Sequence, residues 1–160
     1  MSKQSYVHNR ITRDGLSGNA VDFYDFSVHG GSQATIVLPL KLESKSIITS
    51  GFVYVNTACV GSGASVAIGL NTNTDLLAAT SVTSLTADAI LNLSPSTTAS
   101  ISGDAQSSGV SNNRSLLLTA DRQLKVTISG ANLTAGKLSV VLFYVGPFGN
   151  VKPVTYNMEG

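Results

Sequence analysis

Apolar residues do not alternate with polar ones between Lys137 and Val145, where the sequence reads KLSVVLFYV. A strand with one solvated side hides one face and exposes the other. Here both faces of such a strand would be largely apolar: Leu138, Val140, Leu142 and Tyr144 on one, Ser139, Val141, Phe143 and Val145 on the other. The pattern therefore predicts a strand whose second face is covered by an extra strand or arm of the same chain, or by an adjacent subunit.

Strand patterns recur along the rest of the chain, and the helical period is nearly absent. Runs of β-branched residues interleaved with Ser and Gly are bounded by turn residues, as in strands. One short helical turn is expected at Asn73–Thr80, with Asn73 or Thr74 as its cap. With Lys137–Val145, eight strands are predicted, the other seven being Val21–Val28, Ala34–Leu38, Ile47–Asn56, Ser65–Leu70, Ala89–Leu93, Ser115–Thr119 and Gln123–Ser129.

Short strands separated by Gly-rich turns indicate an all-β fold class, an antiparallel β-sandwich that is jelly-roll-like. One connection, Ser94–Arg114, is long and Ser-rich, and such loops are usually functional or disordered. In the sandwich, the alternating residues of Gln123–Ser129 should pack against apolar residues of two other strands. The predicted core contacts are Leu124, Val126 and Ile128 against Val53, Val55, Val66 and Ile68.

The chain of 160 residues fits one domain, residues 20–145, with an N-terminal arm at 1–19 and a C-terminal tail at 146–160. Pro147 and Pro153 exclude a helix or a central strand from the tail. Both ends carry isolated apolar or aromatic residues, and we expect these arms to wrap a neighbour. The candidates for a partner interface are Tyr6, Val7, Ile11, Leu16, Val141, Phe143, Val145, Phe148 and Tyr156.

Charge and composition limit the classes of partner that the chain can bind. Charged residues make up 12% of the chain and the net charge is +1, so the basic stripe required for nucleic-acid binding is absent. No apolar run approaches the ~20 residues of a membrane-spanning helix, and no secretory signal is expected. The one cysteine, Cys59, cannot form an intramolecular disulfide and is interpreted as a small buried hydrophobe.

Grouped reactive side chains are missing from the sequence. The aspartates are scattered singly, and no His/Cys cluster has zinc-ligand spacing. Asp22 and Asp25 have opposite strand parity, so they should point to different faces and not act as a catalytic pair. The G-x-S-x-G motif does not occur, and His29 is interpreted as a solvated turn residue. We therefore predict no catalytic residue, no metal site, no cofactor and no enzymatic activity.

Three segments carry a resemblance to a known family. AIGLNT at Ala67–Thr72, DLLAA at Asp75–Ala79 and LTADRQLKVTISGANLTAGK at Leu118–Lys137 resemble segments of small β-rich structural proteins of tailed bacteriophage virions. The similarity covers roughly residues 45–145 and includes no catalytic signature. It implies a virion component, either a capsid decoration (cement) protein or the base of a head fibre. Such β-rich subunits commonly assemble as trimers or dimers and contact the capsid through extended arms.

The leading hypothesis is therefore a non-enzymatic virion protein, made in the host bacterial cytoplasm, that binds and stabilises an assembled phage capsid. Its partners would be the major capsid protein or another virion protein, and further copies of itself in a trimer or dimer. The alternative is a receptor- or glycan-binding module of a head or tail fibre, using the Ser94–Arg114 loop. A polysaccharide hydrolase, which would need two carboxylates in a groove, is the third hypothesis.

Overall fold

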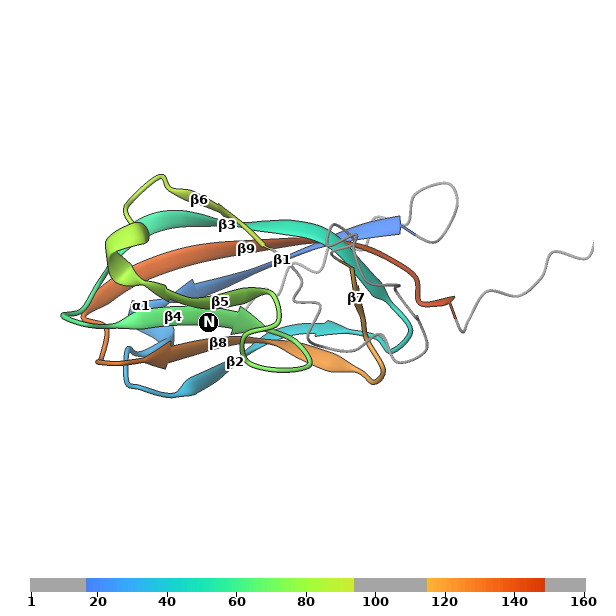
Figure 1. Cartoon of the computed structure of the whole chain (residues 1–160), viewed down its shortest axis with the longest axis horizontal. Helices are drawn as coiled ribbons and strands as arrows, with labels where there is room; N and C mark the ends of the chain where they lie inside the picture. The colour runs from blue at the N-terminus through green and yellow to red at the C-terminus, as the bar shows by residue number, and fades with distance from the viewer. Residues whose placement is uncertain (1–16, 94–114, 149–160) are drawn as a thin grey trace, which may run out of the picture.

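Two antiparallel sheets face each other in the computed structural model, which describes residues 17–93 and 115–148 (Figure 1). Sheet A forms one layer and sheet B the other. Sheet A has the strand order β1 (Ser17–Asp25), β9 (Ala135–Val145), β3 (Ile47–Val60), β6 (Ile90–Asn92), with the short β7 (Leu116–Leu117) also paired to β3. Sheet B has the order β2 (Thr35–Leu42), β8 (Arg122–Ser129), β4 (Ser65–Gly69), β5 (Leu77–Ser81).

The strand pairing is nested from the ends of the chain inward. β1 pairs with β9, β2 with β8, β3 with β6 and β4 with β5, all antiparallel. The β1–β9 and β3–β6 pairs belong to sheet A, and the β2–β8 and β4–β5 pairs belong to sheet B. The predicted all-β antiparallel sandwich is confirmed, whereas its jelly-roll-like character remains a prediction.

The core lies between the sheets and is built by alternation. In β8 the side chains of Leu124, Val126 and Ile128 are buried, as predicted. Val53 and Val55 of β3 are also buried and face them from the opposite sheet. Val66 and Ile68 are buried too, but β4 pairs directly with β8, so they are neighbours of the β8 residues within sheet B rather than across the core. The prediction was wrong on that point because burial patterns do not reveal which strands share a sheet.

Two tight turns meet at one end of the sandwich and require glycine. Gly63 in the β3–β4 turn has φ 76° and Gly130 after β8 has φ 79°, both in the left-handed region. A Cβ on Gly130 would lie 2.3 Å from the carbonyl oxygen of Gly63. The two turns can therefore approach this closely only because Gly130 has no side chain, whereas Gly63 is required for its positive φ alone.

Two local predictions were wrong. The expected strand Val21–Val28 ends at Asp25, because the Asp25 side chain accepts a hydrogen bond from the Ser27 amide and caps a short helix, α1 (Phe26–His29). The expected helical turn at Asn73–Thr80 is instead a bend followed by β5. The only other helix in the described part of the chain is a 3₁₀ turn, η1 (Val82–Ser84).

The bend before β5 is organised by Asp75, which is 2% exposed. Its carboxylate accepts hydrogen bonds from the backbone amides of Leu70 at 2.7 Å, Asn71 at 2.8 Å and Thr72 at 3.0 Å. Three amides around one carboxylate hold the chain in a closed loop and leave the acid satisfied although it is buried. These hydrogen bonds outweigh the weak helix propensity of the segment, so a bend forms in place of the expected helical turn.

The described chain starts and stops at one end of the sandwich (Figure 1). Ser17 of β1 is in register with Val145 of β9, and Val145 with Ile47 of β3. The short β7 pairs with the same start of β3. The arms predicted at 1–19 and 146–160 lie largely outside the described residues, and most of Ser94–Arg114 does as well.

Candidate functional site

Aromatic and β-branched side chains from several strands lie opposite one another on the side of sheet A that faces away from the core. In one cross-strand row, Val141 of β9 has Val21 of β1 on one side and Phe52 of β3 on the other. Side chains at directly opposed positions on one face are within contact distance. The row therefore forms a continuous apolar band across three strands.

A second row runs beside the first. Phe23 of β1 and Tyr54 of β3 flank Ser139 of β9, and Ile90 of β6 lies opposite Tyr54. Together with neighbouring positions of β9 these two rows make up a surface that we name the apolar outer face of sheet A. Its members are Val21, Phe23, Phe52, Tyr54, Ile90, Val141, Phe143 and Val145.

The apolar outer face is exposed within the part of the chain that the structure describes. Phe23 is 45% exposed, Phe143 39% and Ile90 65%. The rings of Phe52 and Phe143 lie 6.3 Å apart, centroid to centroid, so the patch is continuous between β3 and β9. Single exposed apolar residues are ordinary, but a contiguous patch with aromatic members marks an interaction surface.

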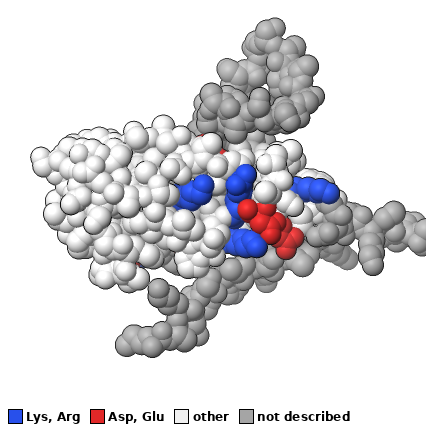
Figure 2. Space-filling view, turned by 90° about the horizontal axis from the view of Figure 1, so that it is seen from below, with Lys and Arg blue, Asp and Glu red and all other residues white. Residues whose placement is uncertain are grey.

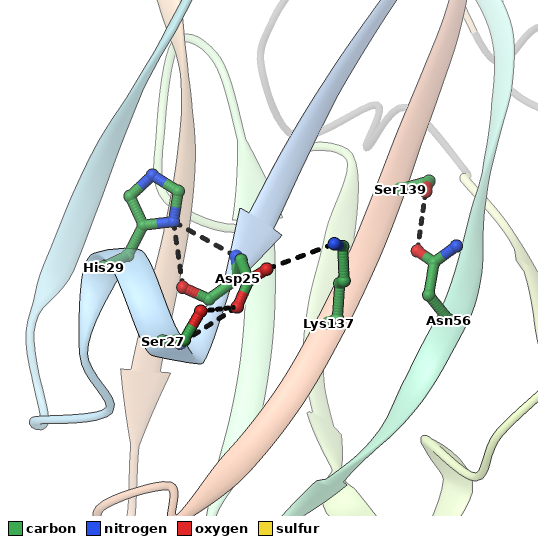
Figure 3. Close-up of polar contacts among 6 residues, drawn as sticks. All are labelled: Asp25, Ser27, His29, Asn56, Lys137 and Ser139. Atoms are coloured by element: carbon green, nitrogen blue, oxygen red, sulfur yellow. Dashed lines mark hydrogen bonds and ion pairs between the residues drawn. The ribbon is translucent and has the colours of Figure 1, made fainter. Parts of the chain in front are cut away.

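One end of the face is polar (Figure 3). Lys137 at the start of β9 forms an ion pair with Asp25, with Nζ to Oδ2 at 3.2 Å. Two residues further along β9, the Ser139 hydroxyl donates to the side-chain oxygen of Asn56 at 2.6 Å. These polar groups bound the apolar face near α1, so a partner would have to remove few charges from water to cover the rest.

The Asp25 carboxylate is held in its charged form. The Ser27 hydroxyl donates to Oδ1 at 2.7 Å, and this hydrogen bond is the main cause that lowers the pKa of Asp25 below its usual value. The Ser27 amide and the Lys137 ammonium lower the pKa of Asp25 further. Near the opposite edge of the sheet, the Tyr54 hydroxyl donates to Asp88, and this bond raises the pKa of Tyr54.

A hollow of about 350 Å³ lies at the other end of the face. Residues of β1, β3 and β9 form it, among them Ser17, Asn19, Thr49, Phe143 and Val145, and most of the lining surface is apolar. It lies where the described chain enters β1 and leaves β9. A hollow of this size can accept one or two side chains of an extended segment.

The outer face of sheet B is of a different kind. Its cross-strand pairs are hydroxyl pairs, with the Oγ1 atoms of Thr35 and Thr127 at 3.0 Å and the Oγ atoms of Ser65 and Ser129 at 2.8 Å. Figure 2 looks onto this side, where Lys and Arg side chains gather beside acidic ones. Lys41 of β2 forms an ion pair with Asp121 at 3.0 Å.

Three residues singled out in the sequence, Val141, Phe143 and Val145, lie together on the apolar outer face. Phe143 is 39% exposed there, and Val141 and Val145 are half-buried. Phe148 is 47% exposed beyond the end of β9, and its amide donates to the carbonyl of Lys45 at 3.2 Å. The other interface candidates lie outside the described residues: Tyr6, Val7, Ile11, Leu16 and Tyr156.

Sequence reasoning missed the other members of the face, including Phe23, Phe52, Tyr54 and Ile90. Their strands were predicted, but the cross-strand register that brings them beside β9 is a long-range property. The sequence did contain one signal for these residues, which is their alternation with the buried residues of the same strand. In β3 the residues Phe52 and Tyr54 are aromatic at positions alternating with buried Val53 and Val55, which already describes a second apolar face.

The reactive side chains of the described residues have separate structural partners. Asp22 accepts a hydrogen bond from the amide of Leu40 on β2 at 2.7 Å, whereas Asp25 is paired with Lys137. Cys59 is buried, and burial raises the pKa of its thiol to about 11. Among residues 17–93 and 115–148, no three His, Cys, Asp or Glu side chains lie close enough to hold a metal ion. In these ranges no helix is long and apolar enough to cross a membrane.

Comparison with known proteins found similarity in structure only. No protein-family model and no curated protein sequence matches the chain. A chain of the capsid asymmetric unit of cyanophage Pam1 has a TM-score of 0.57 at 9% identity, covering 81% of this chain and 84% of that one. The fold is shared with a chain of a phage capsid. This confirms, at the level of the fold, the predicted resemblance to virion structural proteins.

Two further structures were found. A chain in the capsid of Ralstonia phage GP4 has a TM-score of 0.49 at 16% identity, covering 79% of this chain and 83% of that one. A chain in the acid-stable capsid of Helicobacter pylori bacteriophage KHP30 has a TM-score of 0.47 at 14% identity, covering 82% of this chain and 89% of that one.

Proposed function

We propose that this protein is a non-enzymatic structural component of a phage virion that binds the assembled capsid through the apolar outer face of sheet A. The observation that carries the proposal is the exposure of a contiguous aromatic and β-branched surface on a sheet whose opposite side already has a complete core. The fold shared with a chain of the Pam1 capsid supports the choice of a virion as the setting.

The composition of the face supports protein binding over other kinds of binding. Aromatic residues are enriched at the centres of protein interfaces and charged residues are depleted there. On this face the described charged groups are confined to its borders, at the Asp25–Lys137 ion pair and at Asp88 beside Tyr54. Fully burying a large apolar side chain contributes roughly 1.5–3 kcal/mol, and because Phe143 and Phe23 are already more than half buried, a partner that covers either one would gain roughly half of that or less.

The proposed mechanism is stabilisation by preferential binding. A protein that binds only the assembled lattice, and not free capsid subunits, shifts the equilibrium toward the lattice by mass action, by about 2.7 kcal/mol at a hundredfold excess over Kd. Because a capsid repeats the same site many times, several weak contacts by linked copies would give a large avidity. The partner in this proposal is the major capsid protein or another virion protein.

The test is to mix purified protein with capsids that lack it. Co-sedimentation at micromolar protein, together with a higher melting temperature of the capsid, is the expected result. Free capsid subunits serve as the control and should not bind. Absence of binding to intact capsids at micromolar concentration would count against the function. The predicted homo-oligomer, a trimer or dimer, remains a separate prediction that the native mass in solution tests.

A further inference from the structure

His29, the last residue of α1, accepts a hydrogen bond from the backbone of β1. The amide of Asp25 donates to its Nδ1 atom at 3.1 Å. Sequence reasoning took His29 as a solvated turn residue, whereas the structure shows it half-buried. Its ring stacks on the ring of Tyr24, with the centroids 5.8 Å apart. The imidazole is therefore a structural partner of the end of the strand.

This hydrogen bond fixes the state of the imidazole ring. A backbone amide can only donate, so Nδ1 must carry a lone pair and the neutral ring must hold its hydrogen on Nε2. Imidazole is the side-chain group that ordinarily gains its charge between about pH 8 and about pH 5. In the charged ring both nitrogens are donors. The bond from the Asp25 amide to Nδ1 can therefore exist only while His29 is neutral.

The charged ring would find a different partner on the same residue. Nδ1 lies 3.2 Å from the carbonyl oxygen of Asp25, to which a protonated Nδ1 can donate after a small rotation of the ring. The Asp25 carboxylate points away from the imidazole, toward the Ser27 hydroxyl and the Lys137 ammonium that bind it (Figure 3). Protonation would therefore exchange the backbone amide of Asp25 for its carbonyl.

The titratable groups that face the ring come from the two strands packed against α1. They are Tyr24 and Asp25 of β1 and Lys137 of β9. Burial raises the pKa of Tyr24 to about 12, so its hydroxyl stays neutral and donates to the carbonyl of Gly30. Asp25 and Lys137 form an ion pair at 3.2 Å, and the pKa of Asp25 is lowered, mainly by the Ser27 hydroxyl. In this corner His29 is therefore the group whose charge changes on mild acidification.

We propose that His29 is a pH-dependent cap of β1, whose neutral ring holds the Asp25 amide and whose protonation releases this amide and turns the ring to the Asp25 carbonyl. The same strand offers a matched case, because Oδ1 of Asp22 accepts the amide of Phe23 at 2.8 Å. A carboxylate keeps its lone pairs throughout the pH range in which imidazole titrates. Mild acid should therefore open the cap at Asp25 and leave the cap at Phe23 closed. This inference does not depend on capsid binding.

Nitrogen-15 NMR of the full-length protein, without capsids, tests the proposal. At about pH 8, the ring shifts should identify the form with hydrogen on Nε2, and a coupling across the hydrogen bond should join Nδ1 to the amide nitrogen of Asp25. Both signatures should disappear as the ring is protonated. The protection factor of the Asp25 amide against hydrogen exchange, which corrects for the ordinary effect of pH, should fall by roughly tenfold or more.

The amide of Phe23 is the internal control, and its protection factor should stay constant over the same pH range. A neutral ring that carries its hydrogen on Nδ1 would overturn the proposal. Protection of the Asp25 amide that does not change as the ring is protonated would overturn it as well.

Two substitutions separate protonation of His29 from other effects of acid. His29→Phe keeps an aromatic ring beside Tyr24 but has no acceptor, so the Asp25 amide should exchange roughly tenfold or more faster already at about pH 8. His29→Asn offers a side-chain oxygen that does not titrate, and the Asp25 amide should stay protected down to about pH 5. Unchanged exchange in the Phe variant, or pH-dependent protection in the Asn variant, would contradict the assignment of the cap to His29.

Discussion

The two outer faces of the sandwich are built from strands of the same fold but have different chemistry. The face of sheet A carries aromatic and β-branched residues such as Phe23, Phe143 and Ile90. The face of sheet B carries hydroxyl pairs and the Lys41–Asp121 ion pair. Folding requires only that the inward faces be apolar, so the apolar character of one outward face calls for a reason other than folding.

Two strands make the difference visible in the sequence. In β8 every buried residue is followed by a polar one, as in Leu124-Lys125-Val126-Thr127, so its second face is suited to water. In β9 the residues between the buried ones include Val141, Phe143 and Val145, so its second face is suited to a partner. The comparison shows that the inward residues of a strand are selected by packing in the core, whereas its outward residues indicate what the strand contacts, water or a partner.

We expect the largest effect from replacing a polar side chain that stabilises the fold, rather than an apolar one that would bind a partner. Asp75→Ala removes three hydrogen bonds from the bend that precedes β5, at the edge of sheet B, and leaves amides without a partner. We expect a loss of about 3–4 kcal/mol in the free energy of unfolding, measured by urea denaturation. Thr74→Ala, at an exposed position of the same bend, is the control and should change stability by less than about 1 kcal/mol. A loss that small for Asp75→Ala would contradict the account of the bend.

The second prediction applies the same substitution to both faces. Val141→Glu places a charge at the centre of the apolar outer face, whereas Val37→Glu places one on sheet B, opposite Lys125. Val141→Glu should weaken capsid binding by about a hundredfold, equivalent to about 2.7 kcal/mol, because the charge must be desolvated. Val37→Glu should leave binding within about threefold, which is less than about 0.7 kcal/mol. Equal effects of the two substitutions on co-sedimentation would remove the distinction between the faces.

Alkaline pH should lower the stability of the core, and this loss does not depend on either outer face. Tyr24 is fully buried and donates to the carbonyl oxygen of Gly30 at 2.7 Å. Burial raises the pKa of Tyr24 to about 12. Because the pKa of Tyr24 is higher in the folded protein than in the unfolded chain, where it is about 10, burial of the neutral side chain stabilises the fold fully below about pH 10. This stabilisation, about 2 kcal/mol, is lost as the pH rises toward 12.

The check is urea denaturation as a function of pH. Tyr24→Phe should be about 1 kcal/mol less stable near neutral pH because its hydrogen bond is lost, and its stability should fall less steeply above about pH 10. Burial of Cys59, whose pKa is raised to about 11, contributes a further part of the alkaline loss. Identical alkaline limbs for the Tyr24→Phe and unmodified proteins would contradict the assignment.

The smallest expected effects come from the ion pairs, one on each face. Lys137→Ala and Lys41→Ala each break an exposed pair, with Asp25 and Asp121 respectively. Each should change stability by less than about 1 kcal/mol. The pKa of both carboxylates is lowered, for Asp25 mainly by the Ser27 hydroxyl and for Asp121 mainly by the Ser44 amide. Their contributions are therefore present above the unfolded pKa, about 4, and are lost as pH falls through the lower folded values.

The sequence was sufficient to predict the elements that depend on local alternation. β3, β4, β8 and β9 follow from runs of β-branched residues, and the sandwich follows from their number. α1 and the Asp75 bend were missed because each depends on one carboxylate accepting backbone amides, which a periodic pattern does not show. The assignment of Val66 and Val53 to different sheets was missed because strand order is set by the whole chain.

The candidate site was predicted in part for the same reason. Val141, Phe143 and Val145 stood out because they interrupt the alternation of a single strand. Phe23 and Ile90 come from strands distant in sequence, and they join the face only through the register of β1 with β9 and of β6 with β3. Sequence pattern can therefore identify the centre of such a face, whereas its extent requires the structure.

The most direct test of the central claim is side-chain footprinting with hydroxyl radicals, on the free protein and on the protein bound to capsids. The account predicts that labelling of Phe23, Phe143 and Ile90 falls on binding, while labelling of Val37 on sheet B, whose exposure of 53% lies within their range, is unchanged. Protection of Val37 with continued labelling of Phe23, Phe143 and Ile90 would show that the other face is the contact surface and would contradict the account.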